Sequence, residues 1–160
     1  MYTFLLLLLT MENTCSSVDV QLSEHFRLSE FTRSATAILY GIDNTPQEEH
    51  VDALKALCDN VLEPLRRRFG VIRITSGYRC RDLNEKVGGV RTSQHLTGEA
   101  ADIHVGSRDT GQKYFDFIRD NLDFDQLLLE MKGSKVHCLH ISYSTLHKNR
   151  HLINSYYHVK

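Results

Sequence analysis

The ten residues from Ser93 to Asp102 constrain this chain more than any other stretch. They read Ser-Gln-His-Leu-Thr-Gly-Glu-Ala-Ala-Asp, so Gly98 lies between His95 and Asp102. Imidazole and carboxylate are both good zinc ligands, and a glycine lets the chain reverse tightly between them. The small side chains of the two alanines allow the backbone to pack closely beneath an ion. The segment therefore predicts two ligands of one metal site.

A third ligand occurs late in the chain, where His140 lies in the segment Val-His-Cys-Leu-His-Ile-Ser-Tyr. Three protein ligands and one open position are the requirement of a catalytic zinc site. An isolated histidine in an apolar strand is usually a core residue, but its occurrence together with His95 and Asp102 favours a ligand. The three residues predict a zinc hydrolase.

Composition limits the alternatives. The chain has 160 residues, enough for one domain with its own core, and a formal net charge of −1. The balanced charge gives no reason to expect nucleic-acid binding. The four cysteines form no Cys-x-x-Cys pair, so a zinc finger or a redox motif is not expected. Cys58 is expected to be buried on a helix, and Cys138 to be a free thiol beside the metal.

The first residues have two interpretations. The apolar run at 4–9 is too short to span a bilayer, so stable membrane insertion is not expected. It is either the core of a signal peptide without the usual basic start, or a translated stretch upstream of a true start at Met11. We therefore divide the chain into an N-terminal extension, 1–20, and one domain, 21–160.

The hydrophobic pattern predicts an α+β fold, with helices packed on a small, mostly antiparallel sheet. Thr45, Pro46 and Glu48 resemble a helix start with a capping box, Pro64 predicts a kink, and Gly70 a stop. Phe26 and Phe31 are expected to dock into the core from two short turns. The remaining elements are predicted as helices over 45–68, 82–87 and 108–121, and strands over 71–75, 100–105, 124–131, 136–143 and 151–158.

The strands over 124–131 and 136–143 should form a hairpin because the connection is short. Alternation along the second strand places Cys138 and His140 on one face and His137 on the other. Glu130, on the neighbouring strand, is the candidate general base, because a carboxylate near the metal can carry a proton from water to the leaving amine. His137 is the alternative, provided that a bulge changes the strand register.

Several motifs resemble the M15 zinc peptidases over roughly residues 21–145. They are Ser-Gly-Tyr-Arg at 76–79, Leu-Asn at 83–84, Val-Gly-Gly at 87–89, Ser-x-His-x-x-Gly-x-Ala-x-Asp at 93–102, and His-Ile-Ser at 140–142. Within that family the chain looks like the D-alanyl-D-alanine carboxypeptidase type, which is common in bacteria and their phages. Many relatives have Trp two residues before the last ligand, where this chain has Cys138; the difference bears on substrate packing and leaves the ligand set intact.

The resemblance implies zinc on His95, Asp102 and His140. It implies that Arg79 contacts the substrate, where a guanidinium can hold a carboxylate or carbonyl. Arg79 is also counted with Glu130 as a catalytic candidate, and the further substrate-binding candidates are Tyr78, Ser93 and Gln94. The implied partner is the peptidoglycan stem peptide. The protein is expected to be a monomer that acts in the bacterial envelope or is encoded by a phage and delivered to the cell wall. The alternative function is a non-catalytic, zinc-bearing binding module of the same fold, as in the hedgehog signalling domain.

Overall fold

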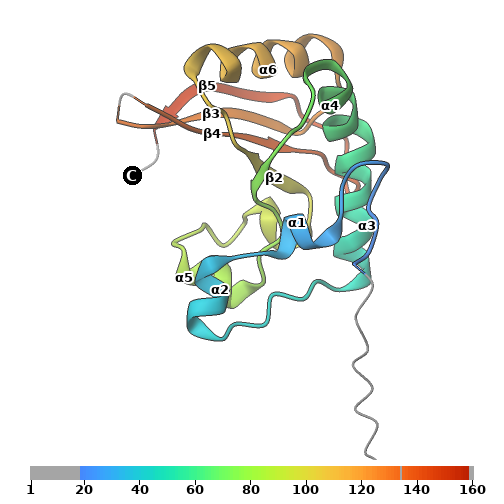
Figure 1. The fold of residues 1–160 in the computed structure, drawn as a ribbon, viewed down its shortest axis with the longest axis vertical. Helices are drawn as coiled ribbons and strands as arrows, with labels where there is room; N and C mark the ends of the chain where they lie inside the picture. The colour runs from blue at the N-terminus through green and yellow to red at the C-terminus, as the bar shows by residue number, and fades with distance from the viewer. Residues whose placement is uncertain (1–18, 134, 159–160) are drawn as a thin grey trace, which may run out of the picture.

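The computed structural model describes residues 19–133 and 135–158, which contain a five-stranded sheet in the order β1-β2-β4-β3-β5 (Figure 1). The strands are β1 (Ile74–Ser76), β2 (Ala100–Ile103), β3 (Gln126–Lys132), β4 (Lys135–Ser142) and β5 (Leu152–His158). Neighbours are antiparallel except β3 and β5, which are parallel. The predicted α+β class with a mostly antiparallel sheet is confirmed.

The helices lie before the first strand or between the first three strands of the chain. They are α1 (Leu28–Thr32), α2 (Ala35–Tyr40), α3 (Glu48–Leu57), the π-helical segment η1 (Cys58–Leu62), α4 (Glu63–Phe69), α5 (Arg81–Lys86), the 3-10 turn η2 (Gln94–Thr97) and α6 (Arg108–Asn121). Within 19–133 and 135–158, no helix is both long and apolar enough to cross a membrane. The two interpretations of the leucine-rich start concern residues outside the described ranges.

The predicted helix over 45–68 differs from the structure at its start. The N-cap is Gln47, and α3 begins at Glu48. The backbone N–H and the hydroxyl of Thr45 both donate to Asp43 Oδ1, at 3.0 and 2.6 Å. The short side chain of Asp43 thus offers the backbone a local turn in place of a helical start. The predicted capping role of Thr45 is therefore wrong.

The interruption predicted at Pro64 is present as a change of helix type. Proline has no N–H, and its ring crowds the carbonyl four residues earlier. The turn just before it, η1, is widened, and the N–H of Glu63 donates to the carbonyl of Cys58, five residues back. The helix thereby continues past Pro64 into α4 and ends at Gly70, which has a positive φ of 87°.

One face of the sheet forms the core. Alternate residues of β3 and β4 on this face are fully buried: Leu127, Leu129, Leu139 and Ile141. They pack beneath α6, which presents Phe115 and Ile118 (Figure 1). Each fully buried side chain of this kind contributes about 1.5–3 kcal/mol. The predicted docking of the two early phenylalanines is also confirmed, because both are buried in the same cluster.

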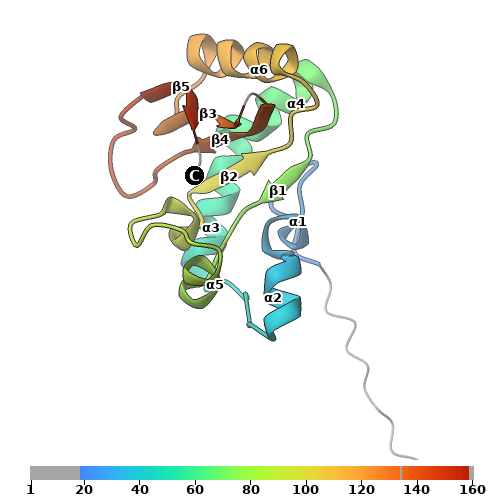
Figure 2. The same ribbon diagram turned by 90° about the vertical axis from the view of Figure 1, so that its left-hand side faces the viewer.

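The opposite face of the sheet is the floor of an open groove of about 1360 Å³. One row of paired residues crosses all five strands there, in the order Ser76, Asp102, His140, Leu128 and Asn154. All five line the groove. Figure 2 shows that α2 and α5 lie at the opposite end of the molecule from α6. The N-terminus of α2 and the loop after α5 form one wall of the groove.

Candidate metal centre and groove

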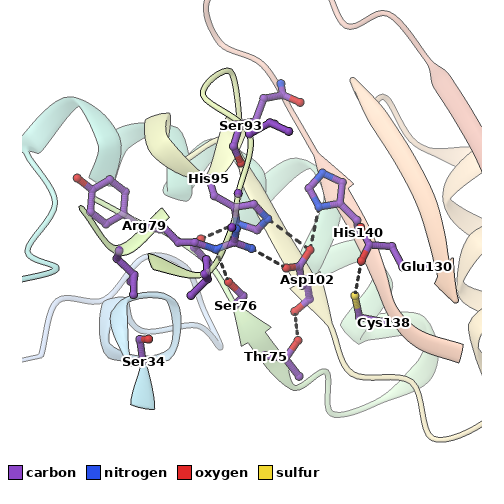
Figure 3. A pocket seen from close by; sticks show the side chains of 18 of the residues that line it. Ser34, Thr75, Ser76, Arg79, Ser93, His95, Asp102, Glu130, Cys138 and His140 are labelled. Carbon is purple, nitrogen blue, oxygen red and sulfur yellow. Dashed lines mark hydrogen bonds and ion pairs between the residues drawn. The ribbon is translucent and has the colours of Figure 1, made fainter. Parts of the chain in front are cut away.

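Three segments bring the predicted ligands together (Figure 3). Asp102 on β2 and His140 on β4 are direct cross-strand partners, so the sheet register places them side by side. His95 lies on η2, which ends at Gly98 with φ 73°. A side chain at Gly98 would also place a Cβ 2.3 Å from the carbonyl oxygen of His50. Glycine is thus needed there both for the turn and for the close approach.

The three side chains present one nitrogen or oxygen each within 4.8 Å of one another. His140 Nδ1 lies 2.8 Å from Asp102 Oδ1, and His95 Nε2 lies 3.4 Å from the same oxygen. Ligand atoms around a tetrahedral zinc ion, with bonds of about 2.0–2.2 Å, are about 3.3–3.6 Å apart. The spacing therefore fits zinc after a small opening of the His140–Asp102 contact.

The hydrogen bonding of His95 also points to a cation. Its Nδ1 lies 2.6 Å from the carbonyl oxygen of Gly77, which can only accept, so Nδ1 carries a proton. In the neutral ring, Nε2 then presents a lone pair toward the carboxylate of Asp102. Two lone pairs facing each other at 3.4 Å need a proton or a metal ion between them. This donor set fits zinc.

The carboxylate of Asp102 is held in its charged form. Burial alone would raise its pKa, but the neighbouring imidazoles of His95 and His140 outweigh burial by charge and by hydrogen bonding. The pKa of Asp102 therefore lies well below its usual range. A carboxylate that stays ionised in a mostly buried position is suited to bind a divalent cation.

Arg79, the predicted substrate clamp, is engaged by the protein. Its Nη2 donates to Asp102 Oδ2 at 3.1 Å, its Nε donates to Ser76 Oγ at 3.0 Å, and its Nη1 lies 3.5 Å from Asn84 Oδ1. The guanidinium thus fixes the oxygen of Asp102 that the two histidines do not contact. Arg79 also lines the groove, so a substrate contact remains a prediction.

Glu130 lies on β3 opposite Cys138, and both line the groove beside the ligands (Figure 3). The buried thiol of Cys138 donates to Glu130 Oε2 at 3.4 Å. Burial raises the pKa of this thiol, and the charges of Asp102 and Glu130 act in the same direction. The expectation that Cys138 is a free thiol is confirmed.

The alternation argument against His137 is wrong at this position. The pairing shifts between Glu130, opposite Cys138, and Met131, opposite Val136, which leaves His137 as an extra residue on β4. At a bulge of this kind the side chains no longer alternate regularly. His137 is exposed and lines the groove, so both base candidates reach it.

The other predicted substrate residues are placed differently from one another. Ser93 lines the groove and is half-buried. Tyr78 and Gln94 also line it, but Tyr78 is largely buried and its ring stacks on His50 with centroids 5.1 Å apart. Gln94 donates from Nε2 to Asp125 Oδ2 at 2.9 Å, while its buried Oε1 has no partner among the described residues. Gln94 therefore anchors the turn that carries His95.

Sequence reasoning assigned no role to Asn84 or to the row beyond His140. Asn84 is buried; its Nδ2 donates to the carbonyl of Val90 at 3.0 Å, and its side chain lies where a Cβ on Gly89 would fall. It therefore shapes the loop that walls the groove. The Leu-Asn and Gly-Gly pairs in the sequence were the available signal.

A second cluster of possible ligands comprises Glu24, His25 and Glu63. Its buried member, Glu63, already accepts from Ser23 Oγ and from the backbone N–H of His25, both at 2.7 Å. Its second oxygen lies 2.9 Å from His25 Nδ1. The cluster ties the early loop to α4 and lies outside the groove lining.

Comparison with known families agrees with this site. The family model described as Peptidase M15 matches residues 24–139. The chain belongs to the M15 peptidase family. Members of this family are typically metallo-enzymes, and the described residues of this chain include a group able to hold a metal ion. No curated protein matches the chain.

Proposed function

We propose that this M15 peptidase is a zinc enzyme that hydrolyses an amide bond in the stem peptide of peptidoglycan. The observation that carries the proposal is the convergence of His95, Asp102 and His140 on one point of an open groove. The motif's resemblance to the D-alanyl-D-alanine carboxypeptidase branch supports the substrate class. The size of the groove, above the usual range for small-molecule pockets, supports a peptide substrate.

The residues that line the groove have different proposed roles. His95, Asp102 and His140 would hold the ion, and Arg79 and Gly77 fix the carboxylate and the first imidazole. A zinc ion there supplies Lewis acidity toward the scissile carbonyl and toward the attacking water.

Glu130 then takes a proton from the attacking water and passes it to the leaving amine. The thiol of Cys138 orients its carboxylate by donating to one oxygen. The presence of this carboxylate on the groove floor favours a hydrolase over a binding module. His137 is the second candidate for the proton transfer, because the bulge brings it to the same groove.

The test begins with the full chain stripped of metal and then reloaded with one equivalent of zinc. Each form is incubated with purified peptidoglycan, and released fragments are identified by mass spectrometry. We expect stem-peptide cleavage by the zinc form alone, with about one zinc bound per chain. Equal cleavage by both forms would contradict the zinc requirement. Cleavage by neither form would contradict the proposal that peptidoglycan is the substrate.

A further inference from the structure

The row of paired residues on the groove floor continues beyond the metal centre. His140 on β4 pairs with Leu128 on β3, and Leu128 pairs with Asn154 on β5. Neighbouring strands lie about 4.8 Å apart, so Asn154 is about 10 Å from His140 across the sheet. An extended peptide rises about 3.3 Å per residue, which makes this distance the length of about three residues.

The side chains at this end of the groove suit an uncharged peptide segment. Leu128 offers a half-buried apolar surface, and the amides of Asn154 and Gln126 flank it. A primary amide both donates and accepts, so it can pair with the N–H and C=O of a peptide backbone. Leu128, Asn154 and Gln126 together are called the β3–β5 shelf below.

Fixed positive charge lies at the other end. Of the described residues that line the groove, the two arginines are Arg33, at the end of α1, and Arg79, beside β1. Among the charged side chains that line the groove, Glu130 lies on the same strand as Leu128, two residues further along it. A substrate that ended there with a free carboxylate would face the carboxylate of Glu130, and neither of the two groove-lining arginines lies on β3 or β5. The chemistry of the shelf thus favours a continuing chain.

We propose that the β3–β5 shelf binds an uncharged substrate residue two or three positions from the cleaved bond. The inference rests on the proposed peptidase function and deepens it, because it makes the enzyme an oligopeptide hydrolase and a poor dipeptidase. Binding energy from a remote part of a substrate can be used to orient the reacting bond. Short substrates should therefore lose kcat as well as affinity.

The test uses synthetic peptides built around the bond that mass spectrometry identifies. The series begins with the dipeptide that contains only that bond and adds one, two and three residues on each side in turn. We expect kcat/KM to rise about tenfold or more when the third residue is added on one side, and Asn154→Ala to reduce this gain about 3–10-fold. Leu128→Ala should reduce it similarly.

Asn60→Ala is the matched control, because Asn60 is an exposed asparagine on η1 and lies outside the groove lining. Its gain with substrate length should equal that of the wild type. If the wild type cleaves the dipeptide and the longest peptide equally well, the β3–β5 shelf is overturned while the peptidase function stands. If no peptide of any length is cleaved by the zinc form, both the function and the shelf are refuted.

A second measurement does not depend on turnover. The metal-free full chain is titrated with the longest and shortest peptides while backbone amide NMR signals are followed. The longer peptide should shift the signals of Leu128 and Asn154, and the dipeptide should leave them in place. Shifts confined to the Arg33 end of the groove with the longest peptide would overturn the shelf.

Discussion

Two buried carboxylates, Asp102 and Asp125, both contact side chains of η2 and differ in the kind of partner that holds them. Both have a pKa below the usual range although burial opposes this, and both are held by nearby nitrogen donors. Asp125 is fully buried and accepts from Arg150 Nε at 2.9 Å, from the Arg150 backbone N–H at 3.0 Å and from Gln94 Nε2 at 2.9 Å. The partners of Asp102 are two imidazoles and Arg79.

The partners explain the difference. The guanidinium of Arg150 cannot lose its proton, and the backbone and amide donors on Asp125 are permanent. The imidazole of His147 lies 3.8 Å from Asp125, but its Nδ1 bonds the carbonyl oxygen of Lys148 at 3.0 Å and so presents a proton and no lone pair there. The imidazoles around Asp102 can be neutral and then present lone pairs, which a metal ion can use. Asp102 also lines the groove, whereas Asp125 does not. Burial and a lowered pKa are therefore shared by Asp125 and by the candidate metal ligand Asp102, and the chemistry of their donors separates them.

The largest expected effect comes from removing an imidazole at Asp102. His140→Ala should reduce bound zinc from about one ion per chain to near zero and abolish peptide cleavage, because two ligands hold zinc poorly. Metal analysis after dialysis measures it. His147→Ala is the matched control, since His147 lies 3.8 Å from the other carboxylate, Asp125, and should leave zinc unchanged. Wild-type zinc content in His140→Ala would remove His140 from the site.

A smaller loss is expected from removing Glu130, the proposed general base beside Asp102. Glu130→Gln should keep zinc and fold but lower kcat about 10²–10⁴-fold, the usual contribution of a general base. His137→Ala, assayed beside it for zinc and for stem-peptide cleavage, should retain most activity. The opposite pattern, with full activity in Glu130→Gln and loss in His137→Ala, would show that His137, the residue at the bulge, is the general base.

The sequence predicted the features that depend on local pattern and strand alternation. Helix α6 has the predicted bounds, and the hairpin of β3 and β4 pairs antiparallel. The motif from Ser93 to Asp102 and the distant His140 were expected to meet, and the sheet register brings them together. Periodicity carried the first two inferences, because each involves one segment or one hairpin, whereas the meeting with His140 was inferred from ligand chemistry and from the resemblance to the M15 peptidases.

Features that depend on tertiary contacts could not be predicted from the sequence. The bulge at His137 changes the face of one side chain, and the short connection before β4 carries no signal for it. The contact of Arg79 with Asp102 joins residues from separate segments, so sequence alone could suggest only a substrate role. Asn154 reaches the groove because β5 adds in parallel to β3, a pairing that alternation cannot fix.

The free energy of unfolding should fall when Asp125, the second buried carboxylate, loses its ion-pair partner. Arg150→Ala leaves the buried charge of Asp125 without its main partner, which costs 3–5 kcal/mol for a fully buried pair. Because the Arg150 side chain is 46% exposed, we expect a smaller loss of about 2 kcal/mol in the free energy of unfolding, measured with urea. Arg119→Ala, in exposed pairs on α6, is the control and should change stability by less than about 0.5 kcal/mol.

Zinc binding by Arg150→Ala also tests whether Asp125 and Asp102 act independently. Zinc content should stay near one ion per chain, because Gln94 still joins Asp125 to the turn that carries His95. A variant that keeps its stability but loses zinc would show that Asp125 serves the metal centre directly. The two carboxylates would then belong to one functional unit.

The smallest effect is the acid response of Asp125, measured on metal-free protein so that zinc does not contribute. Burial opposes ionisation, but the hydrogen bonds from Arg150 and Gln94 outweigh it and lower the pKa of Asp125 in the folded state. The unfolded chain then binds more protons than the folded chain below the ordinary aspartate pKa of about 3.9. Its contribution to stability is complete above that pH and is lost as the pH falls toward the folded pKa. Urea midpoints between pH 6 and pH 2 should fall less steeply in Asp125→Asn than in the wild type, although the variant is less stable at pH 6. Parallel curves would show that the lowered pKa of Asp125 does not contribute to stability.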